Sequence, residues 1–224
     1  MAHTANGPPA RRNGRPRQPA KAASGEPGPR RGERRDDIIA AALEEFSASG
    51  FAAARLDDVA RRAGVAKGTI YLYFRDKESL FQELVRVMVH PLVGAITTAP
   101  LHDLPVRAVL EMIVEVFVTE ILGTRRKDVL RLIMAEGPRF PKLAEFYYRE
   151  VIAHVLPVLR ARLTLAVERG ELHNDALARF PQLLVAPGLM AIIWDSLFER
   201  FEHLDVRALM RAHLGVLFGE RSAT

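Results

Sequence analysis

The stretch of residues 59–74, VARRAGVAKGTIYLYF, restricts the fold more than any other part of the chain. Its first half places small and apolar residues at helical spacing, namely Val59, Ala60 and Ala63. Gly64 follows, where a helix commonly ends in a left-handed residue that only glycine adopts without strain. In the second half Ile70 and Phe74 are four residues apart, so they share one face of a second short helix. The pattern predicts a helix-turn-helix.

The second helix of this unit carries donors and aromatic rings on the face away from its apolar side: Lys67, Thr69, Tyr71 and Tyr73. Hydroxyl and ammonium groups of this kind suit phosphates and base edges. The alternative interpretation is a buried helical hairpin, which gives no reason for two tyrosines, a lysine and a threonine on the outer face. The pattern therefore favours a nucleic-acid-binding unit.

The segment GVAKGTIYLYFRDKESLF closely resembles the recognition segment of the TetR family of bacterial transcriptional regulators. The resemblance runs from about Asp36 to Leu84, and its diagnostic residues are Gly64, Val65, Gly68, Thr69, Tyr71, Tyr73, Phe74 and Lys77. It implies an all-α fold, with a three-helix head that contains the helix-turn-helix and a C-terminal helical body for ligand binding and dimerisation. The expected division is a disordered basic arm over residues 1–31, a DNA-binding domain over 32–78 and an effector-binding and dimerisation domain over 79–220.

The resemblance also implies a function and its site residues. The chain is expected to be a ligand-responsive regulator, most often a repressor, that binds a two-fold double-stranded DNA operator as a homodimer and is released by a small-molecule effector. Thr69 and Tyr71 would meet bases and neighbouring phosphates, while Tyr73 and Lys77 would hold phosphates. The family's remaining contact positions are occupied by Lys67, Gly68 and Leu72.

The remaining helices of the head are expected over about residues 32–48 and 56–63, with a fourth helix that starts at the N-cap Asp76. Gly50 should end the first helix, and Phe51 should pack back onto the bundle. The family usually has Ser or Thr before its second helix and often Ser before its third. This chain has Arg55 and Ala66 at the corresponding places, so the side-chain caps should be missing and Arg55 is expected to reach a phosphate by charge instead.

Longer helices, interrupted by proline and glycine, are expected in the body. Their expected ranges are 104–122, 128–135, 140–169 with an interruption near Pro157, a nearly all-apolar helix over 189–198 after two proline breaks, and 205–218. Pro91 should kink or end the helix that joins the head to the body. Residues 131–148, RLIMAEGPRFPKLAEFYY, resemble the body of a TetR subgroup often called AefR-like.

The nearly all-apolar helix predicts a surface that a partner covers, because a helix that is apolar all round must be buried on every side. The family dimerises through its last two long helices, which form a four-helix bundle across a two-fold axis. The resemblance therefore implies a dimer interface built from Ile193, Trp194, Leu197, Leu209, Met210, His213 and Leu217. An ordinary core helix is the alternative, and a measurement of the oligomeric state separates the two.

Candidates for the effector pocket are chosen by bulk and helix placement: Phe117, Ile121, Met134, Phe146, Tyr147, His154, Met190, Trp194 and Phe198. Glu111 and Glu115 are four residues apart on one helix face. They form either a partly solvated stripe or a carboxylate that meets a cationic effector in the pocket. His154 lies on an otherwise apolar helix, where a hydrogen-bonded core histidine is expected rather than a ligand.

Several function classes are excluded by what the sequence lacks. The chain has no cysteine, which rules out disulfides, zinc-thiolate sites and cysteine nucleophiles. It has no nucleophile elbow, Walker loop, Rossmann glycine pattern or H-E-x-x-H motif, so neither an enzyme nor a cofactor or metal site is expected. No apolar run reaches the ~18 residues of a membrane span and no signal peptide is visible, so no membrane association and a cytoplasmic location are expected.

Two alternatives to the effector-released repressor stay open at this point. One is a TetR-fold DNA-binding protein that acts architecturally or under a protein partner, without a small effector. The other is a helical enzyme or carrier that uses a body pocket, although the missing catalytic spacing and the complete recognition segment argue against it.

The net positive charge of the chain lies at its N-terminal end. Residues 1–35 contain nine Arg or Lys and two acidic residues, a net charge of +7, so the rest of the chain carries −2. Gly14-Arg15-Pro16-Arg17 resembles the core of an AT-hook, and Arg15 and Arg17 are therefore expected to enter a narrow minor groove. A tail that only improves solubility is the alternative.

Deletion of residues 1–30 should leave the dimer and the core operator preference intact but weaken binding, most for operators with A·T-rich flanks. The salt dependence should become shallower because fewer counterions are released. Binding to one operator with A·T or G·C flanks, at several salt concentrations, checks this. An equal loss on both flanks would reduce the arm to a non-specific polycation, and no loss would make it a passive extension.

Overall fold

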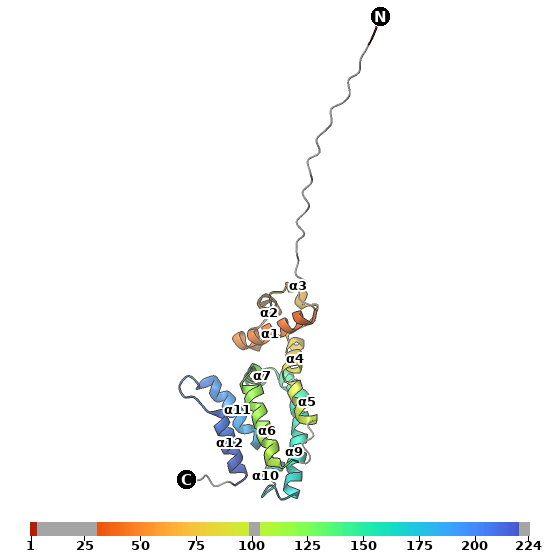
Figure 1. Ribbon diagram of the computed structural model, residues 1–224. Helices are drawn as coiled ribbons and strands as arrows, with labels where there is room; N and C mark the ends of the chain where they lie inside the picture. Colours follow the sequence, from red (N-terminus) through yellow and green to blue (C-terminus); the bar gives the residue numbers. More distant parts are fainter. Residues whose placement is uncertain (4–30, 99–103, 220–224) are drawn as a thin grey trace.

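The structure is a computed structural model that describes residues 1–3, 31–98 and 104–219, and within these ranges it contains helices and no strand. The predicted all-α fold is confirmed, whereas Arg15 and Arg17 lie outside the described residues. The head consists of α1 (Arg31–Ala53), α2 (Leu56–Arg62) and α3 (Lys67–Ile70), and α4 (Lys77–Met88) leads from it. Figure 1 shows this head at one end of the molecule, with the body helices below it.

Local signals in the sequence set the helix ends of the head. Gly64 has a φ of 66°, as the turn between α2 and α3 requires. Asp76 caps α4 through a capping box, because its side chain accepts from the Ser79 amide while the Ser79 hydroxyl accepts from the Asp76 amide. Neither Arg55 nor Ala66 provides a side-chain cap for α2 or α3, as expected.

Gly50 interrupts α1, and Phe51 turns back into the core as predicted. Gly50 has φ 73° and ψ 159°, a conformation that is essentially restricted to glycine. Phe51 is fully buried, with ring centroids of Phe46, Phe81 and Phe140 at 5.3, 6.0 and 5.1 Å. Because the helix is broken here, the Phe51 amide has lost its helical partner, and it donates to the buried carboxylate of Glu136 at 3.2 Å.

A second interruption joins the head to the body. α5 (His90–Thr98) is bent by about 40° from α4, next to Pro91 as predicted. The Leu92 amide donates to the Val89 carbonyl instead of continuing the α4 pattern to Met88. The Met88 carbonyl accepts a hydrogen bond from Arg126 Nε at 2.7 Å.

The body contains the remaining elements: α6 (Val106–Val116), η1 (Phe117–Leu122), α7 (Arg126–Glu136), α8 (Pro141–Tyr147), η2 (Tyr148–Ile152), α9 (Ala153–Glu168), α10 (Ala176–Arg179), α11 (Gln182–Leu197) and α12 (Val206–Leu217). η1 and η2 are π-helical segments. The interruption expected near Pro157 is not found there, because Pro157 lies inside α9 and the irregular segment η2 ends at Ile152. Pro187 was expected to break the chain but lies inside α11. In Figure 1, α11 and α12 lie on one flank, α6 and α7 in the middle, and α5 and α9 on the other flank.

Two apolar clusters hold the molecule together. The first unites the head with α4, α7 and α8, and the second fills the body between α6, α9, α10 and α12. Phe146 and Tyr147, two of the residues expected in the effector pocket, belong to the first cluster, at 2% and 8% exposure. Burial also raises the pKa of the Tyr147 hydroxyl. The body helix α8 is therefore part of the same core as the head.

No single helix among the described residues is long and apolar enough to cross a membrane. The bent pair α4–α5 meets the length and composition limits only when its two parts are taken together. The apolar side of α4 is already buried in the first cluster, through Leu80, Phe81, Leu84 and Val85.

Gly50→Ala should lower the free energy of unfolding by about 2–3 kcal/mol, because the new residue would hold a glycine-only conformation. Its Cβ would also lie 2.7 Å from Glu136 Oε1. Gly94→Ala is the matched control, since a Cβ at Gly94 meets nothing within 4 Å in the helix α5. Urea unfolding at one fixed protein concentration measures both. A Gly50→Ala variant as stable as Gly94→Ala would show that alanine adopts the Gly50 conformation without strain.

Candidate nucleic-acid interface and body cavity

The segment from Lys67 to Tyr73 separates an apolar inner side from a polar outer side, as predicted. Ile70 is fully buried, and Phe74 just beyond it is 5% exposed. Tyr71 and Leu72 are 50% and 76% exposed, and Lys67 and Gly68 are also exposed. Thr69 and Tyr73 are half-buried at the edges of this face. We call the surface formed by these residues the recognition face: Lys67, Gly68, Thr69, Tyr71, Leu72 and Tyr73.

Gly68 leaves the backbone of the recognition face uncovered. A Cβ built at this position meets nothing within 4 Å, and its φ lies outside the region that requires glycine. Neither the packing of the protein nor the backbone conformation therefore needs a glycine here. A missing side chain on an exposed face allows another molecule to approach the backbone closely.

The recognition face is tied to α2 through Asp57, a residue that the sequence pattern did not single out. Asp57 accepts hydrogen bonds from Lys67 Nζ at 2.6 Å and from the Tyr71 hydroxyl at 3.4 Å. The hydrogen bond to Lys67 holds the pKa of the Asp57 carboxyl below its usual value and raises that of the Lys67 ammonium. A phosphate that binds Lys67 must therefore displace the Asp57 carboxylate or share the Lys67 ammonium with it.

Helix α2 is in turn fixed on α1 by the carboxylate of Glu45, which is only 7% exposed. Glu45 accepts hydrogen bonds from the Ser49 hydroxyl at 2.7 Å and from Arg62 Nη2 at 2.9 Å. The Ser49 hydrogen bond, with that of Arg62, holds the pKa of this carboxyl below its usual value. These contacts fix the orientation of α2 on α1, and with it the orientation of the recognition face.

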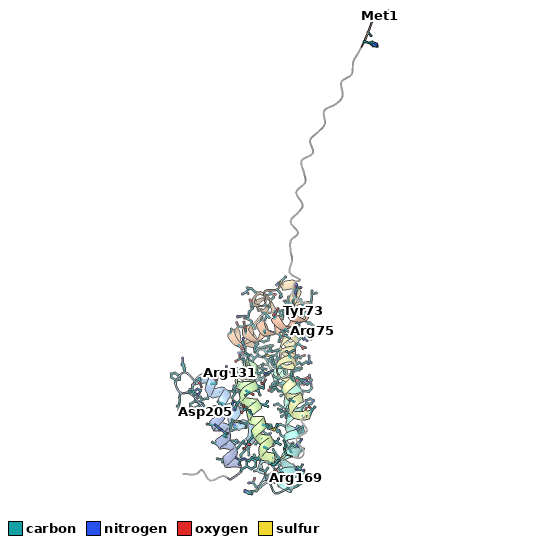
Figure 2. All side chains as sticks on the ribbon, in the orientation of Figure 1. Met1, Tyr73, Arg75, Arg131, Arg169 and Asp205 are labelled. Carbon is teal, nitrogen blue, oxygen red and sulfur yellow. The ribbon has the colours of Figure 1, made fainter. Side chains whose placement is uncertain are left out.

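Lys77 does not belong to the recognition face, and the expected phosphate contact is not supported. Its ammonium donates to the carbonyls of Phe51 and Ala52 at 2.7 and 2.9 Å and lies 4.8 Å from the centroid of the Phe51 ring. Lys77 therefore holds the end of α1 against α4. Arg55 is exposed as expected. Arg75, whose side chain is 87% exposed beside Tyr73, is a further cation that was missed (Figure 2).

The body contains an apolar cavity of about 120 Å³ between α5, α6 and α9. Its walls are formed by Ala95, Ile96, Val106, Val109, Leu110, Met112, Ile113, Val116, Val158, Leu159, Arg162 and Leu163. A smaller cavity of about 50 Å³ lies between α6, α9, α11 and α12, where Phe117 contributes to the wall. We call the larger of the two the body cavity.

Most of the predicted pocket residues lie elsewhere. Phe117 lines the smaller cavity, whereas neither cavity is lined by Ile121, Met134, Phe146, Tyr147, His154, Met190, Trp194 or Phe198. His154 is exposed on α9, so the expected core histidine is wrong. Glu111 and Glu115 form the solvated stripe, paired with Arg107 and Arg207 at the surface, and bring no carboxylate into the body cavity.

Helix α11 carries an exposed apolar stripe opposite its buried side. Gly188, Ala191 and Ile192 are buried. Leu189, Ile193 and Leu197 are spaced by four residues, and Leu183, Met190 and Leu197 by seven, so these residues share one side of the helix. We call them the outer stripe. Leu197 is 55% exposed, and the flanking Phe201 is 72% exposed. Monomeric proteins rarely expose contiguous apolar surface of this kind.

The predicted dimer residues divide between this surface and the interior. Ile193 and Leu197 lie on the outer stripe, while Leu209, His213 and Leu217 are half-buried on α12. Met210 is 4% exposed in the second apolar cluster, so its predicted interface role is wrong. Trp194 is half-buried and closes the turn after α11, because its Nε1 donates to the Glu202 carbonyl at 2.9 Å.

Comparison with known proteins identifies both parts of the chain. Residues 38–84 match the family model described as bacterial regulatory proteins, tetR family, and residues 103–212 match the model described as Tetracyclin repressor-like, C-terminal domain. The AefR-like subgroup is not among these matches and stays a prediction. The body is thus similar to known regulators over most of its length.

Individual relatives agree with the family models. The HTH-type transcriptional regulator SrpR of Pseudomonas putida is 30% identical over 140 residues, which cover 62% of this chain and just under two thirds, 64%, of SrpR. The uncharacterized HTH-type regulator TtgW of Pseudomonas putida is 32% identical over 105 residues, 47% of this chain and 75% of TtgW.

A solved structure shows the same fold. The transcriptional regulator FadR from Bacillus subtilis, in complex with stearoyl-CoA, matches with a TM-score of 0.66 and 21% identity over 83% of this chain and 98% of FadR. The matched models, the two Pseudomonas regulators and the helical architecture point to a DNA-binding transcriptional regulator rather than an enzyme. The chain belongs to the TetR family of bacterial transcriptional regulators.

Proposed function

We propose that this regulator is a repressor that binds a two-fold operator as a homodimer and leaves it when a small molecule occupies the body. The observation that carries the proposal is the recognition face: a short segment anchored by the buried Ile70 and Phe74 turns its donors and its uncovered backbone outward. Such a repressor would act on the chromosome, so we place it in the cytoplasm.

The recognition face supports major-groove binding. Tyr71 and Thr69 carry hydroxyls that can meet base edges or phosphates, and Lys67 carries a charge that can meet a phosphate. The uncovered backbone at Gly68 lets this face approach the groove closely. Arg55 and Arg75 extend the positive surface on either side, where backbone phosphates of the duplex would lie.

The outer stripe supports the homodimer. Its apolar residues would be buried between two copies of α11, and α12 would add its own exposed side at Ala208, Ala212 and Val216, spaced by four residues. In a two-fold dimer two recognition faces would meet successive major grooves, about 34 Å apart. A monomer has only one such face, so dimerisation would set both the affinity and the symmetry of the operator.

The body cavity supports control by a small molecule. It lies away from the head and is bordered by α5, which continues through the bend at Pro91 into α4. The FadR structure shows that a protein of this fold holds a ligand. An effector would release DNA only if it binds one arrangement of the two heads better than the other. The cavity also counts against the alternative, a regulator controlled by a protein partner or acting architecturally without a small effector.

Gly68→Ala should weaken operator binding by about tenfold, ~1.4 kcal/mol, because the added methyl would separate the recognition face from DNA. Stability should not fall, since the methyl meets nothing within the protein. Gly94→Ala, also in open space but remote from the recognition face, should bind the operator normally. Fluorescence anisotropy with an operator selected from a random DNA pool measures all three proteins. Unchanged operator binding by Gly68→Ala would contradict the inference that the backbone at Gly68 approaches DNA closely.

Leu197→Glu should raise the dimer dissociation constant by at least about a hundredfold, because it would place an unpaired charge in a dry interface. Tyr148→Glu is the control: Tyr148 is 60% exposed on η2, away from the outer stripe, and its variant should stay dimeric. Sedimentation velocity over a concentration series distinguishes them. A folded Leu197→Glu variant that dimerises like the wild type would place the interface on another surface.

A further inference from the structure

The body cavity combines an apolar wall with one cation. Among the described side chains that line it, only Arg162 is charged, and the remainder are Ala, Val, Leu, Ile and Met. Arg162 projects from α9, where it is half-buried between Val158 and Ala166, one turn away on either side. A guanidinium beside apolar surface is poorly hydrated, so it is stabilised when an anion supplies hydrogen-bond acceptors.

Arg162 also lacks the partner that other half-buried arginines have. Arg126 and Arg131, whose side chains are 26% and 28% exposed, are each bound by a carboxylate. Within the described part of the chain, no hydrogen bond or ion pair reaches the guanidinium of Arg162. Arg160, two residues earlier on the same helix, is exposed and needs no partner because water solvates it. The cation of the body cavity is therefore available to a ligand.

The surroundings of Arg162 increase the positive potential at this end of the cavity. A small recess beside it is lined by Arg169 and Glu171. Glu171 is already engaged, because one carboxylate oxygen accepts from the Val106 amide and the other lies 4.0 Å from Arg169 Nη1. The amino end of α6, with its positive helix dipole, begins at the same recess that Arg162 lines. This end of the cavity therefore favours an anion.

We propose that the effector is a small amphipathic monocarboxylate, with its apolar part in the body cavity and its carboxylate on Arg162. The volume limits the size: a 150 Å³ apolar cavity holds benzene, so a cavity of 120 Å³ limits the apolar part of the ligand to about one ring or a short chain of about six carbons. The single unpaired guanidinium favours one negative charge. This inference rests on the proposed release of the repressor by a small molecule, and it names the chemical class of that molecule.

Calorimetric titration of the full-length protein with hexanoate, benzoate, hexan-1-ol and hexylammonium tests the class. Hexanoate or benzoate should bind once per protomer, at least about tenfold more tightly than the alcohol, because a charge-assisted hydrogen bond distinguishes them. Hexylammonium should not bind. Equal binding of carboxylate and alcohol, or tighter binding of the ammonium, would overturn the proposal.

Variants locate the binding to the body cavity. Arg162→Gln should remove the preference for carboxylate over alcohol, Arg162→Lys should restore part of it, and Arg160→Gln should behave like the wild type. Ala95→Phe should weaken both ligands, because Ala95 lies exposed at the cavity wall on α5 and a ring there would fill the space without disturbing the core. Retention of the carboxylate preference by Arg162→Gln would overturn the assignment of the anion to Arg162.

Operator binding, measured in parallel on the selected DNA, separates this proposal from the proposed function. If carboxylates bind through Arg162 but leave the operator complex intact, the ligand class stands and the proposed release of DNA fails. If another class of molecule releases the operator while carboxylates do not bind, release stands and the ligand class falls. Arg162→Gln without ligand should bind the operator like the wild type, which shows that the variant is folded.

Discussion

Where a helix breaks inside the protein, its unpaired backbone groups must find new partners. Helix α7 provides them at two breaks, one within the head and one between the head and the body. At Gly50 the amide of Phe51 is left without a helical acceptor, and Glu136 at the end of α7 accepts from it. At the bend between α4 and α5 the carbonyl of Met88 accepts from Arg126, at the start of α7. The two ends of one body helix thus fix the two irregular points of the head.

The other side of α7 is bound to α11, the helix that carries the outer stripe. Lys127 Nζ donates to Asp195 at 3.0 Å, and Arg131 also donates to that carboxylate. Arg125 reaches Glu44 of α1 at 3.0 Å. Because charge-assisted hydrogen bonds of this kind are directional, a rotation of α7 against α11 would change the contacts with α1 and α4 as well. The geometry of a dimer formed through α11 and the orientation of the head are therefore not independent.

Sequence reasoning predicted features whose cause lies within a few residues. The turn at Gly64, the cap at Asp76 and the bend at Pro91 follow from backbone sterics or from neighbouring side chains, and the structure contains all three. Sequence reasoning failed where the hydrogen-bonding partners of a side chain come from distant parts of the chain. Lys77 has the spacing of a phosphate contact, yet the turn after Gly50 brings two carbonyls to its ammonium.

Apolar stripes were ambiguous for the same reason. A helix face that meets the core, a cavity or a second copy has one and the same pattern, so Met210, Phe146 and Ile193 could not be told apart by spacing. Arg162 is one of two arginines in α9, and spacing does not distinguish it from Arg160. Only the structure shows that Arg162 lines the body cavity whereas Arg160 is exposed.

The body cavity and the recognition face are connected by a short mechanical path. Ala95 and Ile96 of α5 line the cavity, and α5 begins at the bend that leads into α4. α4 carries Lys77, whose ammonium holds the end of α1. On the opposite wall, α6 continues into η1, where the Glu120 carbonyl accepts from Arg126, the residue that also binds Met88. A ligand that separates α5 from α6 would therefore act on the bend between α4 and α5 in two ways, through α5 itself and through the Arg126 contact with Met88. Only a ligand that binds one position of α5 more tightly than another could shift the orientation of the head.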